Sequence, residues 1–130
     1  MAQRPAAFLV DTDIFIDYLN GVRRTREFLG APQYRVYYSA VTRKELLTKP
    51  GLSATERRRI RMLLLRHRLI AVDEGIATRF SLLLSKYTNQ GLRKADALVA
   101  ATAWSRRLPL LTRNTRHYRF ISEIRLVSGV

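Results

Sequence analysis

The stretch Ala6-Ala7-Phe8-Leu9-Val10-Asp11-Thr12-Asp13 joins a short apolar run to two acids. A run of this kind is typical of a buried β-strand, so Asp11 is expected at the carboxyl end of that strand. The apolar residues from Ile14 to Leu19 then predict a short helix that stops at Asn20-Gly21. Ligands of open α/β sheets bind beyond the carboxyl ends of the strands. The stretch therefore puts two carboxylates where a site is expected.

Strand-like segments alternate with helical ones over the rest of the chain. Further strands are expected at 35–39, 70–72, 109–112 and 124–127. Further helices are expected at 23–29, from Thr42 to Pro50, from Ser53 to about Arg68, at 75–88 and at 95–104, with a single turn at 116–121. This alternation predicts one α/β domain over residues 1–130, with a mainly parallel sheet covered by helices on both faces.

The charge balance is strongly basic, with 24 Lys and Arg against 10 Asp and Glu and a net charge of +14. So large an excess favours a polyanionic partner, and nucleic acid above a membrane surface, because no lipid-anchor motif or basic amphipathic tail is present. Solubility and an acidic partner protein are the alternatives. The absence of cysteine excludes disulfides, thiolate metal sites and cysteine nucleophiles. No apolar run approaches the ~20 residues of a membrane span, which favours a cytoplasmic protein.

Three acids stand beside apolar residues at distant points of the sequence: Asp11, Glu45 and Asp96. A carboxylate in such surroundings must lose hydration, so it is tolerated only when it is paired, hydrogen-bonded or bound to a metal ion. Asp96 is the most diagnostic, because residues 95–104 are otherwise apolar all round except for Thr102. Carboxylates gathered in one site would repel each other unless a divalent cation held them ionised. The three acids therefore indicate a metal site.

Local helix chemistry offers a second explanation for some of the acids. Glu45 fits the capping box Thr42-x-x-Glu45, in which its side chain would accept a hydrogen bond from the N-cap amide. Asp13 could be the N-cap of the helix that follows it. Asp96 lies near the start of its helix, where the helix dipole favours negative charge, but it resists this explanation more than the other acids, since an apolar helix gains nothing from an unpaired acid.

Four segments carry a family pattern: Val10-Asp11-Thr12-Asp13, Ser39-x-x-Thr42-x-x-Glu45-Leu46, Ala95-Asp96-Ala97-Leu98-Val99-Ala100-Ala101-Thr102-Ala103 and Leu111-Thr112-Arg113-Asn114-Thr115-Arg116-His117-Tyr118. Together they resemble the motifs of PIN-domain ribonucleases, in particular the VapC toxins of bacterial toxin–antitoxin pairs. The match runs from about Phe8 to Val127, with the motifs in the family's order and spacing. The resemblance implies a PIN-like fold with a five-stranded parallel sheet, dimerisation and inhibition by an antitoxin.

The resemblance also implies roles for individual residues. It makes Asp11, Glu45 and Asp96 the acidic catalytic core, with Asp11 and Asp96 as ligands of Mg²⁺ or Mn²⁺. Glu45 is expected to orient or deprotonate the attacking water. The family's fourth position, often Asp, falls on Asn114, which lacks the charge but can supply a carbonyl oxygen, so Glu45 and Asn114 are further candidate ligands. Supporting roles are expected for Thr12, Asp13, Thr112 and Asn114.

Four arginines are expected to contact RNA: Arg58, Arg61, Arg113 and Arg116. Arg113 and Arg116 could hold a phosphate near the cleaved bond, and a solvated loop is the alternative. Arg58 and Arg61 belong to the densest basic segment, whose residues cannot all share one helix face. His117 is expected to contact RNA or to pack beside Tyr118 instead of binding a metal, because a lone histidine gives no ligand spacing for a metal.

The leading hypothesis is a metal-dependent endoribonuclease that acts as a toxin. Its partners would be an RNA substrate, a cognate antitoxin and a second copy of the chain. The alternatives are a non-catalytic nucleic-acid-binding regulator on a PIN-like scaffold and a structural partner for an acidic protein. A binder of polyanions gains nothing from carboxylates that repel phosphate, whereas a metal enzyme requires them. The acids therefore favour the enzyme.

Overall fold

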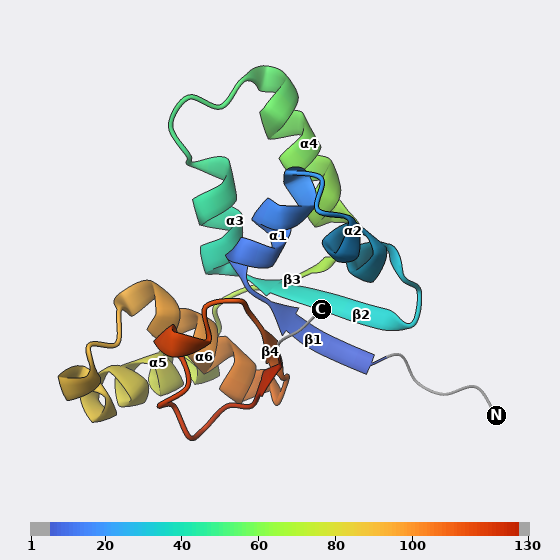
Figure 1. Ribbon diagram of the computed structural model, residues 1–130. Coiled ribbons are helices and arrows are strands. Elements are labelled where there is room, and N and C mark those ends of the chain that lie inside the picture. The colour runs from blue at the N-terminus through green and yellow to red at the C-terminus, as the bar shows by residue number, and fades with distance from the viewer. Residues whose placement is uncertain (1–5, 128–130) are drawn as a thin grey trace.

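The fold is built on one parallel sheet of five strands, in the order β3-β2-β1-β4-β5 (Figure 1). The computed structural model describes residues 6–127, so both ends of the expected 1–130 domain, Met1–Pro5 included, lie outside the described residues. The strands are β1 (Ala6–Val10), β2 (Tyr34–Ser39), β3 (Arg68–Ile70), β4 (Leu110–Leu111) and β5 (Leu126–Val127). The expected parallel sheet is confirmed, and β1 is its central strand.

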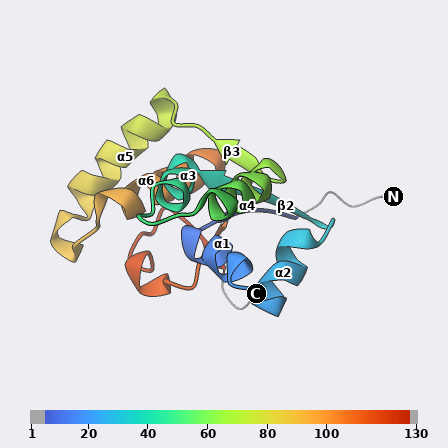
Figure 2. The same cartoon turned by 90° about the horizontal axis from the view of Figure 1, so that it is seen from above.

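Helices cover both faces of the sheet, as the alternating pattern predicts. Figures 1 and 2 show one layer formed by α1 (Thr12–Leu19), α2 (Arg23–Gly30), α3 (Ala40–Leu47) and α4 (Ala54–Leu65). The other layer contains α5 (Glu74–Lys86) and α6 (Lys94–Arg106), with short 3₁₀ turns at η1 (Thr88–Gln90) and η2 (Thr115–His117). Among residues 6–127, none of the helices has the length and apolar character needed to cross a membrane.

Alternation along β1 divides the core between the two layers. Leu9 is fully buried in a cluster with residues of α5 and α6, while Val10 is buried in a cluster with residues of α1, α2 and α4. Leu110 and Leu111 of β4 divide in the same way. Successive side chains of a strand point to opposite faces, so a central strand covered on both sides must be apolar throughout. For this reason the apolar run 6–10 correctly predicted the strand β1.

The third strand begins earlier than the sequence predicts. Residues 70–72 were the expected strand, but β3 pairs with β2 through Arg68, Leu69 and Ile70, and Ala71 and Val72 follow it exposed to solvent. The basic helix correspondingly ends at Leu65 instead of Arg68. The reason is that β3 is an edge strand whose first two residues are exposed, so hydrophobicity does not mark its start.

Capping explains where the α-helices around the site begin. The box at Ser53 and Glu56 is confirmed, since each side chain accepts a hydrogen bond from the other residue's backbone amide. The box expected at Thr42 and Glu45 is wrong. Ser39 caps α3 by accepting from the Thr42 amide at 3.3 Å, so the helix starts at Ala40 and Glu45 lies in its second turn. Glu45 therefore has no capping role.

Candidate functional site

Asp11 lies at the carboxyl end of β1, where its backbone and its side chain are both fixed. Its amide donates to the Leu111 carbonyl of β4 at 2.9 Å. Its Oδ1 accepts from the Thr12 amide, which makes Asp11 the N-cap of α1, and its Oδ2 accepts from the Thr112 hydroxyl, both at 2.9 Å. Asp13 is therefore not the N-cap that the sequence offered as an alternative. Asp11 as a whole is only 7% exposed, and it lies where two neighbouring strands, β1 and β4, meet.

Asp96 lies in the first turn of α6, and the hydroxyl of Tyr118 links it to Asp11. The Tyr118 hydroxyl donates to Asp96 Oδ1 at 3.2 Å, and Tyr118 itself is 1% exposed. Burial, followed by the charges of Asp11 and Asp96, raises the pKa of Tyr118 far above its usual value, so the phenol remains a proton donor. The other oxygen of Asp96, Oδ2, accepts from Arg93 Nε at 3.1 Å. A buried hydroxyl thus stands beside both acids.

Glu45 joins the site through a chain of hydroxyl groups. The Thr12 hydroxyl donates to Glu45 Oε1 at 2.9 Å, and it also lies 2.9 Å from the Thr42 hydroxyl. Because a hydroxyl has one proton, Thr42 must be the donor in the second bond. The direction of the chain is therefore Thr42 to Thr12 to Glu45. Thr12 follows Asp11 directly, so α1 and α3 bring Glu45 to the same end of the sheet.

Asp13 and Asp17 organise the loop after β4. The Arg113 amide donates to Asp13 Oδ2 at 2.9 Å. The Arg113 guanidinium pairs with Asp17, with Nε 2.7 Å from Oδ2 and Nη2 3.1 Å from Oδ1. Asp13 consequently supports the site through the backbone of Arg113. The side chain of Arg113 is held by a carboxylate and keeps only its remaining N–H groups for another ligand.

The electrostatics of the site disfavour negative charge unless a cation is near. Burial, and secondly the charge of Asp13, raises the pKa of Asp11, although hydrogen bonds from Thr112 and Thr12 oppose the shift. Burial likewise raises the pKa of Asp13, in part against the Arg113 amide. Both shifts express the cost of an ionised carboxylate away from water, and a bound cation would reverse them.

The donor set fits a hard divalent cation that keeps water ligands. Within residues 6–127, acidic and histidine side chains do not form a group of three around one point. Asp11 and Asp96 offer carboxylate oxygens, and Mg²⁺ is commonly held by one or two carboxylates together with waters. Oδ1 of Asp13 is buried without a hydrogen-bond partner among the described residues, and such an oxygen calls for a water or a cation. Asn114 is exposed, and its hydrogen bonds run through its backbone.

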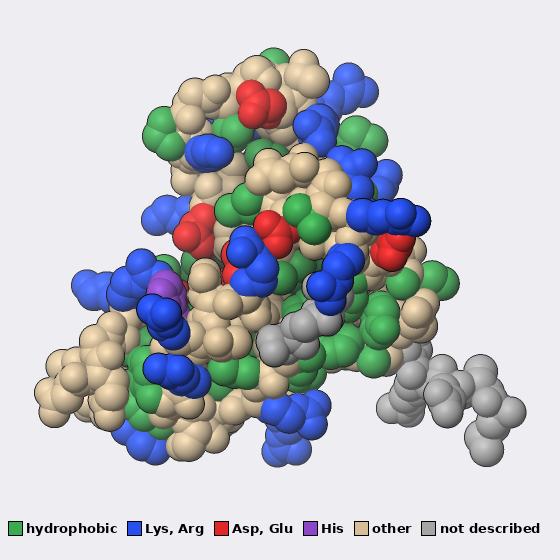
Figure 3. Space-filling view, viewed as in Figure 1, with side chains coloured by type: hydrophobic (Ala, Val, Ile, Leu, Met, Phe, Trp, Pro, Cys, Tyr) green, Lys and Arg blue, Asp and Glu red, His purple; other side chains and the backbone are tan. Residues whose placement is uncertain are grey.

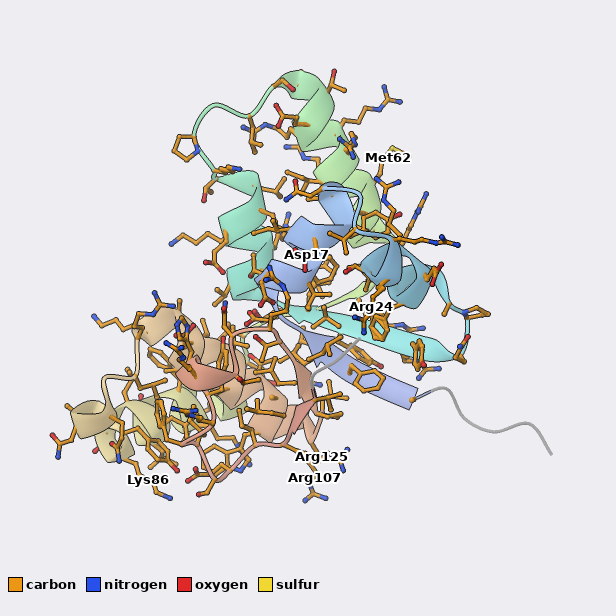
Figure 4. All side chains as sticks on the ribbon, in the orientation of Figure 1. Asp17, Arg24, Met62, Lys86, Arg107 and Arg125 are labelled. Carbon is orange, nitrogen blue, oxygen red and sulfur yellow. The ribbon has the colours of Figure 1, made fainter. Side chains whose placement is uncertain are left out.

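Basic side chains surround acidic ones on one face of the molecule (Figure 3). Figure 3 shows Asp and Glu side chains near the middle of one face, with Lys and Arg around them. Glu45 borders two cavities, one of about 350 Å³ between α1, α3 and α4 and one of about 420 Å³ beside α3, α5 and α6. Arg58, Arg61 and Arg116 are exposed, the first two on α4. Arg107 and Arg125 precede β4 and β5, and point away from the molecule at the opposite end of the sheet (Figure 4).

The sequence predicted a site that includes Asp11, Thr12 and Thr112, and the structure brings these three residues into contact. Three further side chains that touch residues of the site were not predicted. The missed side chains are those of Thr42, Arg93 and Tyr118. Tyr118 gave one usable signal, because a buried tyrosine hydroxyl needs a partner and a buried acid is a suitable one. Thr42 was noted in the sequence as a candidate helix cap, but nothing there tied its hydroxyl to Thr12. Arg93 gave no signal, since a lone arginine before a helix is common on any surface.

Comparison with known proteins agrees with this geometry. A sequence model described as the PIN domain matches residues 8–121. "Ribonuclease VapC10" of Mycobacterium tuberculosis is 31% identical over 121 residues, which is 90% of either protein. A toxin–antitoxin complex from Klebsiella pneumoniae contains a chain that is 32% identical, with a TM-score of 0.72 over 90% of this chain and 94% of that one. VapBC2 of Rickettsia felis, bound to a promoter DNA fragment, shares the fold with a TM-score of 0.85 at 17% identity, over 95% and 99% of the two chains.

Proposed function

This chain belongs to the PIN-domain family, and from that membership we propose that it is a metal-dependent endoribonuclease that acts as the toxin of a toxin–antitoxin module. The observation that carries the proposal is the meeting of Asp11, Glu45 and Asp96 through Thr12 and Tyr118 at one end of the sheet. The net charge of +14 suits an anionic substrate. The acids of the site would repel such a substrate unless a bound cation lay between them and it. RNA is such a substrate.

The cation would be held by Asp11 and Asp96, with Glu45 and Asn114 as further candidate ligands. Mg²⁺ or Mn²⁺ supplies charge neutralisation at the scissile phosphate and a more acidic attacking water when it is bound. Thr112 and Thr12 orient Asp11 by donating to its two oxygens. The buried Tyr118 hydroxyl keeps Asp96 turned toward Asp11.

Glu45 is the residue suited to accept the proton of the attacking water. It is exposed, it has no capping role, and its Oε1 is oriented by the Thr12 hydroxyl while Oε2 is left to solvent among the described residues. A carboxylate with one oriented and one open oxygen can hold a water and take its proton. Hydrolysis by water in this way leaves a 5′ phosphate and a 3′ hydroxyl.

Phosphate groups of RNA would bind the basic side chains that surround these acids. Arg116 is exposed on η2 beside the site, whereas Arg113 would contribute with the N–H groups that Asp17 leaves unused. Arg58 and Arg61 on α4 are suited to more distant phosphates. We assign these four arginines to RNA binding.

The partners follow from the relatives, which include solved toxin–antitoxin complexes. We propose a cognate antitoxin protein and a second copy of this chain as partners, and the cytoplasm as the compartment in which toxin, antitoxin and RNA meet. A regulator that only binds nucleic acid is the alternative function. It would retain the basic surface, but it would have no use for the acids.

A cleavage assay on purified protein tests the proposal. Incubation of end-labelled total RNA with the wild-type protein should give metal-dependent products that carry a 5′ phosphate, and EDTA should stop their formation. The Asp96→Asn protein should give none. Retention of nucleic-acid binding with no cleavage at any Mg²⁺ or Mn²⁺ concentration would favour the regulator.

A further inference from the structure

Both oxygens of Asp96 are occupied by donors of the protein itself. Oδ1 accepts from the Tyr118 hydroxyl at 3.2 Å. Oδ2 lies 3.1 Å from Arg93 Nε and 3.4 Å from His117 Nδ1. A divalent cation that uses Asp96 as a ligand must therefore share or displace at least one of these contacts.

The two kinds of contact differ in how easily they can be displaced. Tyr118 is 1% exposed and packed in the core, so its hydroxyl has no room to move away. The Arg93 side chain is 67% exposed and crosses a single helical turn to reach Asp96. The Asp96 side chain is only 12% exposed, but water and salt compete for the exposed guanidinium, so the arginine is the weakly held member of this ion pair. The arginine is therefore the contact that a cation would displace.

We propose that Arg93 is a substitute cation: it neutralises Asp96 Oδ2 while the metal is absent, and after the metal displaces it, its guanidinium binds a phosphate of the RNA. The inference rests on the proposed function, since it names a further positioning residue for the same site. It would give the ion pair between Arg93 and Asp96 a function in the site.

The surroundings of Arg93 support the second half of this role. Its Nη2 lies 3.0 Å from His117 Nδ1 on η2, so the guanidinium already bridges α6 and the loop after β4. Arg116, the proposed phosphate ligand, precedes His117 directly. Once the guanidinium has left Asp96, a rotation of the Arg93 side chain is enough to bring it to an anion. A guanidinium can then donate two parallel hydrogen bonds to two oxygens of one phosphate.

Lys94 provides a matched control for the change of charge. It is exposed, it follows Arg93 directly, and its ammonium group makes no hydrogen bond or ion pair within residues 6–127. Arg93→Gln and Lys94→Gln remove the same charge from adjacent positions. Only the first removes a contact to Asp96, so the difference between the two variants isolates that contact.

The first measurement is Mn²⁺ binding without RNA, followed through the paramagnetic resonance signal of free Mn²⁺. Arg93→Gln should bind Mn²⁺ about three- to tenfold more tightly than Lys94→Gln, because a competing cation is gone from Oδ2. When Asp96→Asn is added to each variant, the difference should vanish, since the shared partner is removed. Equal Mn²⁺ affinity in Arg93→Gln and Lys94→Gln overturns the proposal.

The second measurement is the anisotropy of a fluorescent oligothymidylate of about 12 nucleotides, used as a single-stranded phosphate probe. With Mn²⁺ present, Arg93→Gln should bind the probe at least threefold more weakly than Lys94→Gln, and with EDTA the two should bind equally. A deficit that is the same with and without metal overturns the proposal. Cleavage of RNA by the wild-type protein is measured separately. If the wild type does not cleave RNA but the Arg93 and Lys94 variants differ as expected, only the nuclease is refuted. If the wild type cleaves RNA but the variants do not differ, only the role of Arg93 is refuted.

Discussion

Replacement of Asp96 by Asn should abolish cleavage while the fold stays intact. Asn keeps the size of the side chain and an oxygen that can accept from Tyr118, but it loses the charge. The Arg93 contact is lost as well, and because the guanidinium is 67% exposed and stays in water without its partner, we expect this loss to cost about 0.2–1 kcal/mol. For a domain of this size, that loss lowers the melting temperature by no more than about 5 °C.

The effect on the rate should be far larger. A metal ligand contributes to a stabilisation of the transition state that amounts to several kcal/mol, and each ~1.4 kcal/mol is a factor of ten in rate. We therefore expect cleavage to fall at least about 100-fold, as measured by the initial rate on a labelled RNA at saturating Mn²⁺. Thermal melts followed by circular dichroism establish that the protein is folded.

Asp73 offers the matched control for this experiment. It pairs with Arg106 at 3.0 Å, far along the chain from the acids of the site, and as the N-cap of α5 it can be replaced by Asn without loss of the cap. Asp73→Asn should match Asp96→Asn in stability and the wild type in rate. A folded Asp96→Asn protein that cleaves RNA within tenfold of the wild type would refute the assignment of Asp96.

The other predictions concern the remaining acids, the basic surface and the fourth motif. Glu45→Gln keeps an acceptor for the hydroxyl chain and disturbs no cap, so it should melt like the wild type yet cleave RNA about 100-fold more slowly or worse; normal cleavage would remove Glu45 from the mechanism. Burial raises the pKa of Asp11 above its unfolded value of 3.8, so the folded protein loses stability as the pH rises from below this value to above the folded pKa. In EDTA, Asp11→Asn should therefore melt at a higher temperature than the wild type at pH 7 but not at pH 4. Equal melting temperatures at pH 7 would contradict the burial argument. Arg61→Ala should lower the log–log salt slope of RNA binding by about 0.7 in a filter-binding titration, while Arg125→Ala at the opposite end of the sheet should not, and equal slopes would exclude Arg61 as a phosphate contact. Asn114→Asp should lower the Mn²⁺ concentration for half-maximal cleavage, and superimposable titrations would place this residue outside the metal site.

The elements nearest the site are those that the sequence predicts best. The apolar run of β1 and the enclosed helix around Asp96 are strong patterns, because a central strand and a buried helix are apolar on all sides. The acids stand out for the same reason, since each breaks such a pattern. The edge strand β3 carries no such contrast, and its start was misplaced by two residues.

The contacts that complete the site lie beyond local patterns. Thr12 meets Glu45 across 33 positions, and Tyr118 meets Asp96 across 22, so nothing in either neighbourhood indicates the partner. The capping interpretation of Glu45 failed because Ser39, three residues before Thr42, competes for the same helix start. Sequence spacing alone could not decide between two hydroxyl residues that are both good caps.

The place of β1 at the centre of the sheet has a consequence for the synthesis of the protein. Asp11 is made before the residue that orients it, because that hydroxyl belongs to a residue 101 positions later, and β1 has no β4 neighbour until that part of the chain exists. At about 5–20 residues per second, a ribosome takes about 5–20 s to cover that distance. Throughout this interval the nascent chain has its first carboxylate and no complete site. A product of interrupted translation that ends before β4 would therefore lack both the strand that pairs with β1 and the hydroxyl that orients Asp11.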